Sequence, residues 1–386
     1  MTRWDAETAV VGLGAWGAAA LWRLASRGVD VVGLDRYTVG HALGSSHGGS
    51  RMLRLARPDH PGLVPLARRS RELWEQLADE GRDMAPGPES LFTAGGGLAI
   101  GPEDGRVAGG TLRAAREHGV PVRTFTASAL RFRYPRHTGV PRRHIGVWEP
   151  SAGVVRPEPA LRAMLAAAKR AGARVTTDSR ITRVEPIPGG VRLHTPHSSL
   201  TARQVVLAAG AWLPALLPGL PLQTVRMPLT WFRELEADSG FDAESFPSFR
   251  RELDDGRILW GNGAQDGQDV SLGLYDGVGE GKPFDPEDTD RSVTAEDWSD
   301  LARLLPAKVP GLETVPARVA VSTRTYAPDG LYVLGRPDAD RRVVVAGGAG
   351  VHGFAQAPGI GEAIADLTTN TPSPMPLAHL SPDRFS

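Results

Sequence analysis

The chain of 386 residues has no cysteine, which excludes disulfides, iron–sulfur clusters, zinc fingers and thiol catalysis. It also lacks an excess of charge, since 44 Lys and Arg residues balance 44 Asp and Glu residues. No electrostatic field therefore favours nucleic acid or an anionic membrane as a partner. Apolar runs of the roughly 18 residues that a membrane-spanning helix needs are missing as well. We expect a cytoplasmic protein, monomeric or in a small homo-oligomer, that acts on small molecules.

What is present is the composition of a folded globular protein, with 41% hydrophobic and 23% charged residues. The length corresponds to two or three domains of about 150 residues each. We expect no metal site, because no close cluster of His, Asp and Glu with ligand spacing occurs. The acidic, glycine-rich stretch 276–300 has the composition of a surface loop, and we assign it no catalytic role.

The N-terminal segment carries a nucleotide-binding motif. A mostly β-branched run at 8–11 precedes GLGAWG at 12–17, and an alanine- and leucine-rich segment then runs to Gly28. This order predicts a strand, a glycine turn, a helix and a helix stop. A second apolar run at 30–34 ends in Asp35, close to the spacing of about 20 residues that dinucleotide-binding βαβ units show.

Each residue of this motif has a physical task. Gly12 suits a tight turn, Gly14 the close approach of the backbone to a pyrophosphate, and Gly17 the packing of helix on strand. The helix N-terminus offers free N–H groups and a positive dipole end to phosphates, and Asp35 suits the ribose hydroxyls. The motif therefore predicts dinucleotide binding and leaves NAD and FAD both open.

Later segments resemble one family. They are GSSHGGSRMLR at 44–54, VLAAGAW at 206–212, VVAGG at 344–348, HGF at 352–354 and PGIGE at 358–362. Together they are similar to the flavin-binding motifs of the monomeric sarcosine oxidase and N-methyltryptophan oxidase family, nearly along the whole chain. The resemblance implies FAD rather than NAD as the cofactor.

The resemblance also implies an α/β architecture in two interleaved domains. A Rossmann-like FAD-binding domain is expected from 1–85, 150–215 and 325–386. An α+β substrate domain with an antiparallel sheet is expected from 86–149 and 216–324.

The residues that this resemblance places against the cofactor come from all three parts of the FAD-binding domain. They are Gly12, Gly14, Ala15, Trp16, Gly17, Asp35, Arg36, Ser45, His47, Arg51, Ile181, Ala209, Gly210, Trp212, Gly348, Gly350, Val351, His352, Gly353 and Phe354.

Three positions depart from the family pattern. Ser322 stands where covalent members carry the cysteine that is joined to the flavin, so we expect FAD to be bound non-covalently. Ser271 replaces a lysine that assists oxygen activation near the flavin N5, which weakens the case for fast use of O2. Ala355 replaces the lysine of the pair that binds the substrate carboxylate.

The expected substrate pocket contains Arg51, Arg54, Trp260, Ser271, Tyr275, Arg324 and His352. Arg54 matches the other member of the carboxylate-binding pair. Arg324 resembles the carboxylate-binding arginine of glycine oxidase relatives, and a guanidinium fork suits a carboxylate. The alternative for Arg324 is a salt bridge to a structural acid. We expect His47 and His352 to contact the flavin or the substrate, and neither to act as a general base.

The resemblance implies FAD-dependent oxidation of a C–N bond in a secondary or primary amino acid, with a hydride passing to flavin N5 and an imine as product. O2, giving peroxide, or another acceptor would then reoxidise the flavin. Two alternatives remain open: an NAD-dependent dehydrogenase that uses the same βαβ unit, and a flavin-binding protein that has lost its activity.

Overall fold

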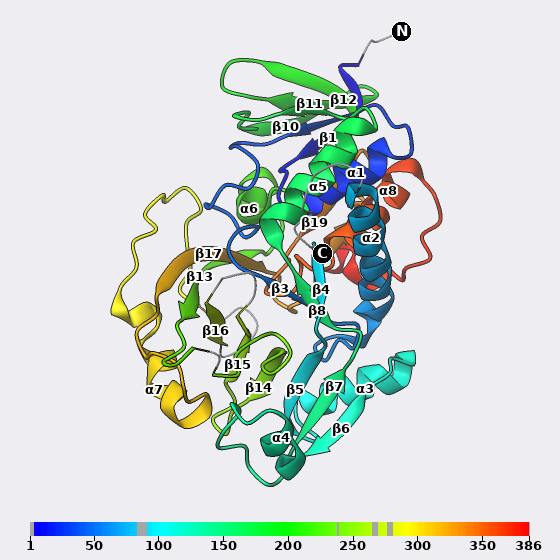
Figure 1. Cartoon of the computed structure of the whole chain (residues 1–386). Coiled ribbons are helices and arrows are strands. Elements are labelled where there is room, and N and C mark those ends of the chain that lie inside the picture. Colours follow the sequence, from blue (N-terminus) through cyan, green and yellow to red (C-terminus); the bar gives the residue numbers. More distant parts are fainter. Residues whose placement is uncertain (1–3, 83–90, 238, 265–268, 276–280, 386) are drawn as a thin grey trace.

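The computed structural model describes residues 4–82, 91–237, 239–264, 269–275 and 281–385. Their strands form three sheets (Figure 1). The first sheet, at the top of Figure 1, lies beside four long helices, the second forms the lower half, and a small three-stranded sheet lies between them.

The first sheet has the strand order β10-β11-β12-β1-β2-β9, with β19 beside the C-terminal half of β12 and β18 beside β19. Its central strands, β19, β12, β1, β2 and β9, are parallel. Valine-rich runs form the central strands because both faces of this sheet are covered. The strands are β1 (Ala6–Val11), β2 (Val31–Leu34), β9 (Arg174–Thr176), β10 (Arg183–Ile187), β11 (Gly190–His194), β12 (Ser199–Leu207), β18 (Val333–Gly335) and β19 (Val343–Gly347).

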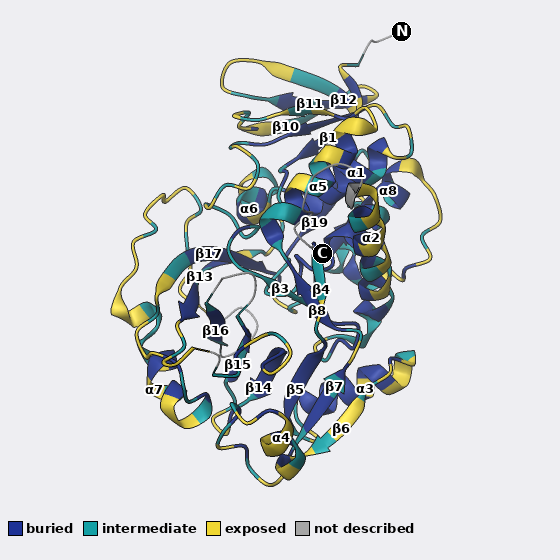
Figure 2. Cartoon of the chain, viewed as in Figure 1, coloured by how far each residue is buried: buried dark blue, intermediate teal, exposed yellow. Residues whose placement is uncertain are grey.

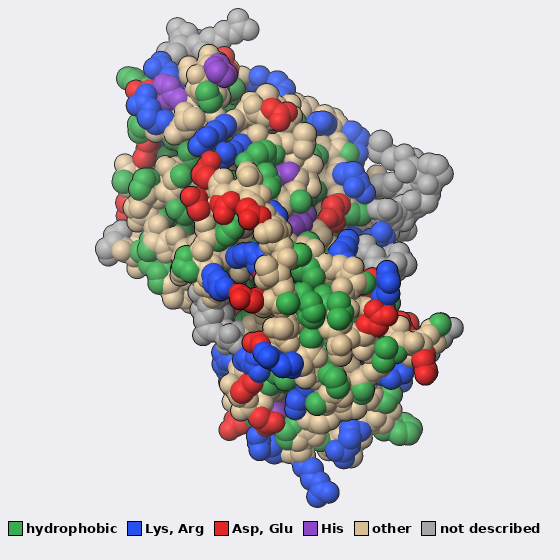
Figure 3. Space-filling model, turned by 90° about the vertical axis from the view of Figure 1, so that its left-hand side faces the viewer, with side chains coloured by type: hydrophobic (Ala, Val, Ile, Leu, Met, Phe, Trp, Pro, Cys, Tyr) green, Lys and Arg blue, Asp and Glu red, His purple; other side chains and the backbone are tan. Residues whose placement is uncertain are grey.

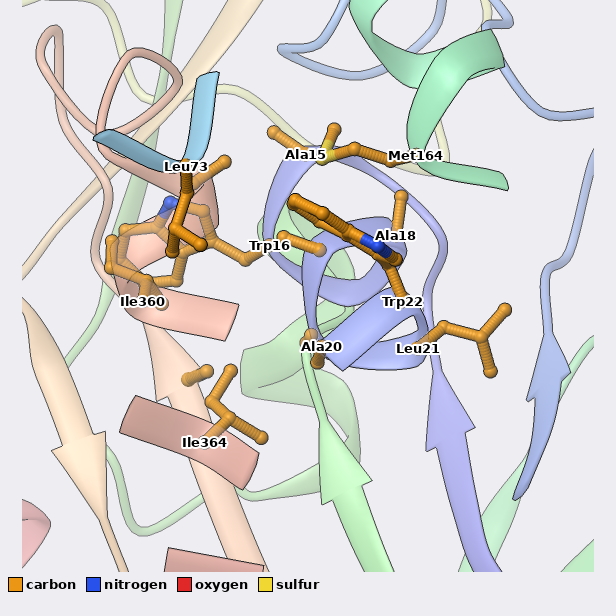
Figure 4. Close-up of a cluster of buried hydrophobic side chains, with 14 of the residues drawn as sticks. Ala15, Trp16, Ala18, Ala20, Leu21, Trp22, Leu73, Met164, Ile360 and Ile364 are labelled. Carbon is orange, nitrogen blue, oxygen red and sulfur yellow. The ribbon is translucent and has the colours of Figure 1, made fainter. Parts of the chain in front are cut away.

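Four helices build the layer beside this sheet: α1 (Ala15–Ala25), α2 (Val64–Arg82), α5 (Pro157–Arg170) and α8 (Ala357–Thr369). Helix α1 is the centre of the layer and contacts both α5 and α8, and nearly all of its side chains are buried. Figure 4 shows Trp16 beside Leu73 and Ile360, and Trp22 beside Met164. The small residues at 17–20 of α1 allow a neighbouring helix to approach closely, as α8 does at Ala19.

The second sheet has eight strands in the order β17-β13-β16-β15-β14-β5-β7-β6. All neighbours are antiparallel except β5 and β14, which run parallel, so the expected antiparallel sheet is in fact mixed. The strands are β5 (Gly97–Pro102), β6 (Arg123–Thr126), β7 (His144–Glu149), β13 (Gln223–Phe232), β14 (Ser248–Glu252), β15 (Ile258–Asn262), β16 (Val270–Tyr275) and β17 (Arg318–Tyr326).

The remaining elements connect and cover these sheets. The third sheet has the order β3-β8-β4, with β3 (Arg51–Leu53), β4 (Phe92–Ala94) and β8 (Gly153–Val155). The other helices are α3 (Ala108–His118), α4 (Ala127–Arg133), α6 (Leu213–Leu216) and α7 (Ser299–Lys308). Short 3-10 turns are η1 (Pro61–Leu63), η2 (Gly210–Trp212), η3 (Ala295–Asp297), η4 (Ala378–Leu380) and η5 (Pro382–Phe385).

Burial follows this layering. The central strands of the two large sheets and the inner helix faces are buried, whereas exposed residues lie on edge strands such as β6 and β10, on the outer helices and on the loops (Figure 2). On the face in Figure 3, positive and negative side chains are interspersed, in keeping with the balanced composition. No helix of the described part of the chain is long and apolar enough to cross a membrane. The α/β architecture expected from the sequence is confirmed.

One contact between α1 and α8 leaves no room for a side chain. A Cβ on Gly361 would lie 2.5 Å from the backbone carbon of Ala19 and 2.7 Å from its Cβ. We therefore expect Gly361→Ala to lower the free energy of unfolding by about 1–3 kcal/mol, because two helix backbones must separate. Thermal and urea unfolding of the protein with its cofactor measure this change.

Gly219→Ala is the matched control, since a Cβ there meets no atom within 4 Å. Equal stability of the two variants would contradict the tight helix contact.

Candidate functional site

A large pocket lies along the ends of the first sheet, where the loops after β1, β2, β12 and β19 meet. Gly12 adopts a φ of 88°, and a Cβ there would lie 2.6 Å from the carbonyl oxygen of Ala208. Gly348 and Gly350, on the other wall, also have positive φ values, of 70° and 52°. Only glycine adopts such conformations readily, so the backbone itself forms this surface, as close contact with a ligand requires.

The carboxylate of Asp35 fixes the turn that begins the pocket. Its two oxygens accept hydrogen bonds from the backbone N–H groups of Leu13, at 2.6 Å, and Tyr37, at 2.9 Å. The N–H of Ala15, the first residue of α1, donates to Ser46 Oγ at 3.0 Å. The start of α1 lines the pocket, so the positive end of the helix dipole lies at the pocket surface.

Glu287 lies on the wall of the large pocket, although the sequence indicated only a surface loop for its segment. Its carboxylate pairs with both terminal nitrogens of Arg36, one of them at 2.8 Å, and the carboxylate of Glu287 is 43% exposed. This pair brings a segment that follows β16 of the second sheet in the sequence against the pocket at the first sheet. Residues 276–280 of the same stretch lie outside the described residues.

A smaller pocket adjoins the large one, and Arg51, Arg324 and Val351 line both. Its floor is the second sheet, which contributes side chains from β13 to β17. The lining residues are Ser50, Arg51, Met52, Arg54, Met227, Leu229, Arg250, Trp260, Asn262, Tyr275, Arg324, Val351 and His352. Four of these are arginines, and none of the described lining residues is an Asp or a Glu.

These arginines differ in what they bind. Arg51 donates four hydrogen bonds to backbone carbonyls of its own loop, among them His47 O at 2.5 Å and Gly48 O at 2.6 Å. Arg54 is buried, and no described residue forms a hydrogen bond with its Nε or Nη1. Burial, followed by the neighbouring positive charges, lowers the pKa of Arg51 and of Arg54 to about 9, so both stay charged at neutral pH.

Arg324 donates from Nη1 to Ser322 Oγ at 2.6 Å and to Thr323 O at 2.8 Å, which are neutral acceptors. Burial lowers the pKa of Arg324. Within the described ranges no carboxylate pairs with it, so the alternative of a structural salt bridge is not observed there.

Arg250 belongs to a cluster centred on Asp59. Its guanidinium lies 3.0 Å from Asp59 Oδ2 and also donates to the Tyr275 hydroxyl. His352 Nε2 lies 3.1 Å from the same carboxylate oxygen. Burial opposes the charge on Arg250, but Asp59 and Tyr275 outweigh it and raise the pKa of Arg250. Burial lowers the pKa of His352 to about 3, so its ring is neutral above pH 5.

The comparisons with known proteins agree with this geometry. Residues 7–367 match the family described as FAD dependent oxidoreductase. The chain is 33% identical to monomeric sarcosine oxidase of Streptomyces avermitilis, over 98% of each chain. The chain belongs to the FAD-dependent oxidoreductase family. It is also 31% identical to N-methyl-L-tryptophan oxidase of Yersinia pestis, over 99% of this chain and 100% of that one.

Solved structures with the same fold include NikD, an amino acid oxidase essential for nikkomycin biosynthesis. NikD gives a TM-score of 0.82 at 23% identity, over 98% of each chain. Glycine oxidase from Geobacillus kaustophilus gives a TM-score of 0.79 at 24% identity, over 97% of this chain and 98% of that one. Family membership sets aside the NAD-dependent alternative, and FAD is the cofactor.

The large pocket fits FAD. Glycines from several loops line it, together with the first residues of α1. The buried Asp35 follows β2, which is where the adenosine half of a dinucleotide requires an acid. Of the residues predicted to contact the cofactor, all but four line this pocket. Gly17 instead packs against Gly12, where a Cβ would lie 1.7 Å from the carbonyl oxygen. His352 lines the smaller pocket, and His47 and Gly353 line neither.

Of the residues predicted for the substrate pocket, all but Ser271 line the smaller pocket. Ser271 lies opposite Asn262 in the β15–β16 pair, and Asn262 is the one that lines it. The Trp260 ring lies across Gly273, where a Cβ would be 2.2 Å from the ring. Ala355 is buried in the helix layer, and its carbonyl accepts from Trp74 Nε1 at 2.8 Å.

Sequence reasoning missed Asp59, Arg250 and Asn262. Arg250 and Arg251 are adjacent on β14, so they face opposite sides of the sheet, and both are buried. Alternation predicts opposite faces, but nothing in the sequence distinguishes the arginine at the pocket from the one that donates to Lys308 O and Gly139 O.

Asp59 makes a pH-dependent contribution to stability. The pKa of Asp59 is well below its usual value because, although burial opposes this, Arg250 and His352 favour the carboxylate. Its contribution is therefore full above pH 4 and is lost as pH falls through the lowered pKa. We expect Asp59→Asn to cost about 1–3 kcal/mol of unfolding free energy at pH 7, less than a fully buried pair, because the carboxylate is 37% exposed.

The test is urea unfolding at pH 7, 5 and 3.5 with excess FAD, with Asp338→Asn as control. Asp338 pairs only at the surface with Arg341, its side chain being 84% exposed. The difference between wild type and Asp59→Asn should shrink at pH 3.5, and a constant difference would contradict the ionised cluster.

Proposed function

We propose that this enzyme oxidises the C–N bond of a secondary or primary amino acid. The observation that carries the proposal is the buried guanidinium of Arg54, whose Nε and Nη1 lack partners in a pocket that adjoins the FAD pocket. A buried cation without a partner costs free energy, and a substrate carboxylate would remove that cost. The relatives' names, which include sarcosine, N-methyl-L-tryptophan and glycine oxidases, support the same class.

The residues of the smaller pocket hold and orient the substrate. When bound, FAD accepts a hydride equivalent from the carbon next to the amine nitrogen. Arg54 anchors a carboxylate of the substrate, and Met227, Leu229 and Trp260 form apolar walls that exclude water. The amine must be neutral to react, and the surrounding guanidinium charges favour loss of its proton.

The pocket contains no obvious general base. The ring of His352 is neutral but engaged with Asp59, so we assign it a positioning role for the pocket wall. Trp260 lines the same pocket, and its Nε1–H is buried without a partner among the described residues. We propose that it donates to a polar atom of the substrate.

We propose that FAD is held without a covalent bond. Ser322 occupies the position of the family's flavin-linking cysteine, and its hydroxyl accepts the hydrogen bond from Arg324. We also propose that 1–85, 150–215 and 325–386 form the FAD-binding domain and that 86–149 and 216–324 form the substrate domain. The separation of the first and second sheets supports this division.

The oxidation itself is tested by the visible spectrum of the protein under argon, titrated with N-methyl, cyclic and primary amino acids. We expect the flavin absorbance to bleach with at least one class. Return of the colour in air, with peroxide, identifies O2 as the acceptor, and a persistently bleached flavin identifies another carrier. A flavin that no amino acid reduces would instead support lost activity.

Arg54→Gln tests the anchor in the same assay. Loss of a charge-assisted hydrogen bond of about 1.5–3 kcal/mol should raise KM by roughly 10- to 100-fold, with flavin still bound. An unchanged KM would remove Arg54 from the binding site.

Acid precipitation tests the attachment of FAD. We expect all of the yellow colour in the supernatant, because the chain has no cysteine to form a thioether. Colour that stays in the washed, denatured pellet would show a covalent bond through another residue.

A further inference from the structure

We infer that the substrate carries two anionic groups, so that it is an amino acid with a second carboxylate on its side chain or on its nitrogen. This inference rests on the proposed function, because it names the substrate class of the same pocket. It starts from two arginines that pair with no carboxylate of the described residues: Arg54, whose Nε and Nη1 have no partner there, and Arg324, which donates to Ser322 Oγ and Thr323 O.

The second sheet separates these arginines. Arg324 is on β17, the edge strand, and it alone of the two also lines the FAD pocket. Arg54 directly follows β3, and its Cγ is 3.7 Å from the Cβ position of Gly97 on β5. Five strand-to-strand steps separate β17 from β5, so the two side chains reach the pocket from different places along the sheet.

Their charged surroundings differ in the same way. The charges that act on Arg54 are those of Arg250, Arg57 and Asp59. In addition to burial, the charge of Arg324 lowers the pKa of Arg51 and of His47. The two guanidinium groups therefore belong to opposite ends of the pocket, and one carboxylate at either end leaves the other cation without an anion.

The other two arginines of the pocket do not need a ligand. Arg51 is saturated by carbonyl oxygens of its own loop, and Arg250 is neutralised by Asp59. Between the ends, Met227, Leu229 and Trp260 offer an apolar surface that suits a short carbon chain. A dicarboxylate amine would thus satisfy both free cations and bury its chain between them.

Binding of non-oxidisable acids tests this inference without relying on turnover. The probes are glutarate and pentanoate, which share a five-carbon chain and differ by one carboxylate. Their affinities for the FAD-loaded protein are measured from the flavin spectrum and from thermal shift. We expect glutarate to bind at least about tenfold more tightly than pentanoate, and Arg324→Gln and Arg54→Gln each to abolish that preference.

Arg318→Gln is the matched control, because Arg318 is exposed on the same strand as Arg324 and should leave both affinities unchanged. Arg324→Lys, which keeps the charge, should retain part of the preference and guards against a folding defect. Equal affinity for both acids, or an equal loss of both in Arg324→Gln, would overturn the inference, since the latter means that both arginines hold one carboxylate.

The same samples separate this inference from the proposed function. N-methylaspartate and N-methylalanine are compared as flavin reductants under argon. Faster bleaching by N-methylaspartate supports the inference, and faster bleaching by N-methylalanine contradicts it while leaving amino-acid oxidation intact. Preference for glutarate with no bleaching by any amino acid would contradict the proposed oxidation alone.

Discussion

A buried guanidinium is costly unless oxygen atoms surround it, and this constraint organises the junction between the two pockets. Four arginines line the smaller pocket, and the carboxylate of Asp59 pairs with one of them, Arg250. Two of these arginines have acceptors within the protein: backbone carbonyls bind Arg51, and Asp59 binds Arg250. The remaining positive charge, on Arg54 and Arg324, is available to a ligand, and Arg324 also lines the FAD pocket.

Much of the fold was predictable because its signals are local. The glycines at 12, 14 and 17 lie between or within β1 and α1, which are adjacent in the sequence. A short segment therefore suffices to predict this βαβ unit. The C-terminal motif is equally local, and it forms β19 and α8. The parallel pairing of β5 with β14 was not predictable, since those strands are separated by more than a hundred residues and register depends on tertiary packing.

The site was predictable only where family motifs cover it. Arg54, Trp260, Tyr275 and Arg324 line one pocket as expected, because the motifs specify the loop and the strands that carry them. Asp59 lies just before η1 and Arg250 lies on β14, and no spacing pattern along the chain predicts a contact between residues so far apart in the sequence. The motif comparison placed Ser271 in the substrate pocket, but Asn262, its partner on the neighbouring strand, lines the pocket instead.

The most direct test is a crystal structure of the protein with FAD and glutarate bound. We expect one carboxylate of glutarate at Arg54 and the other at Arg324, with the chain crossing the face of Trp260. If both guanidinium groups converge on a single carboxylate, or if Arg324 contacts only FAD, the division of the pocket into two anion-binding ends is wrong.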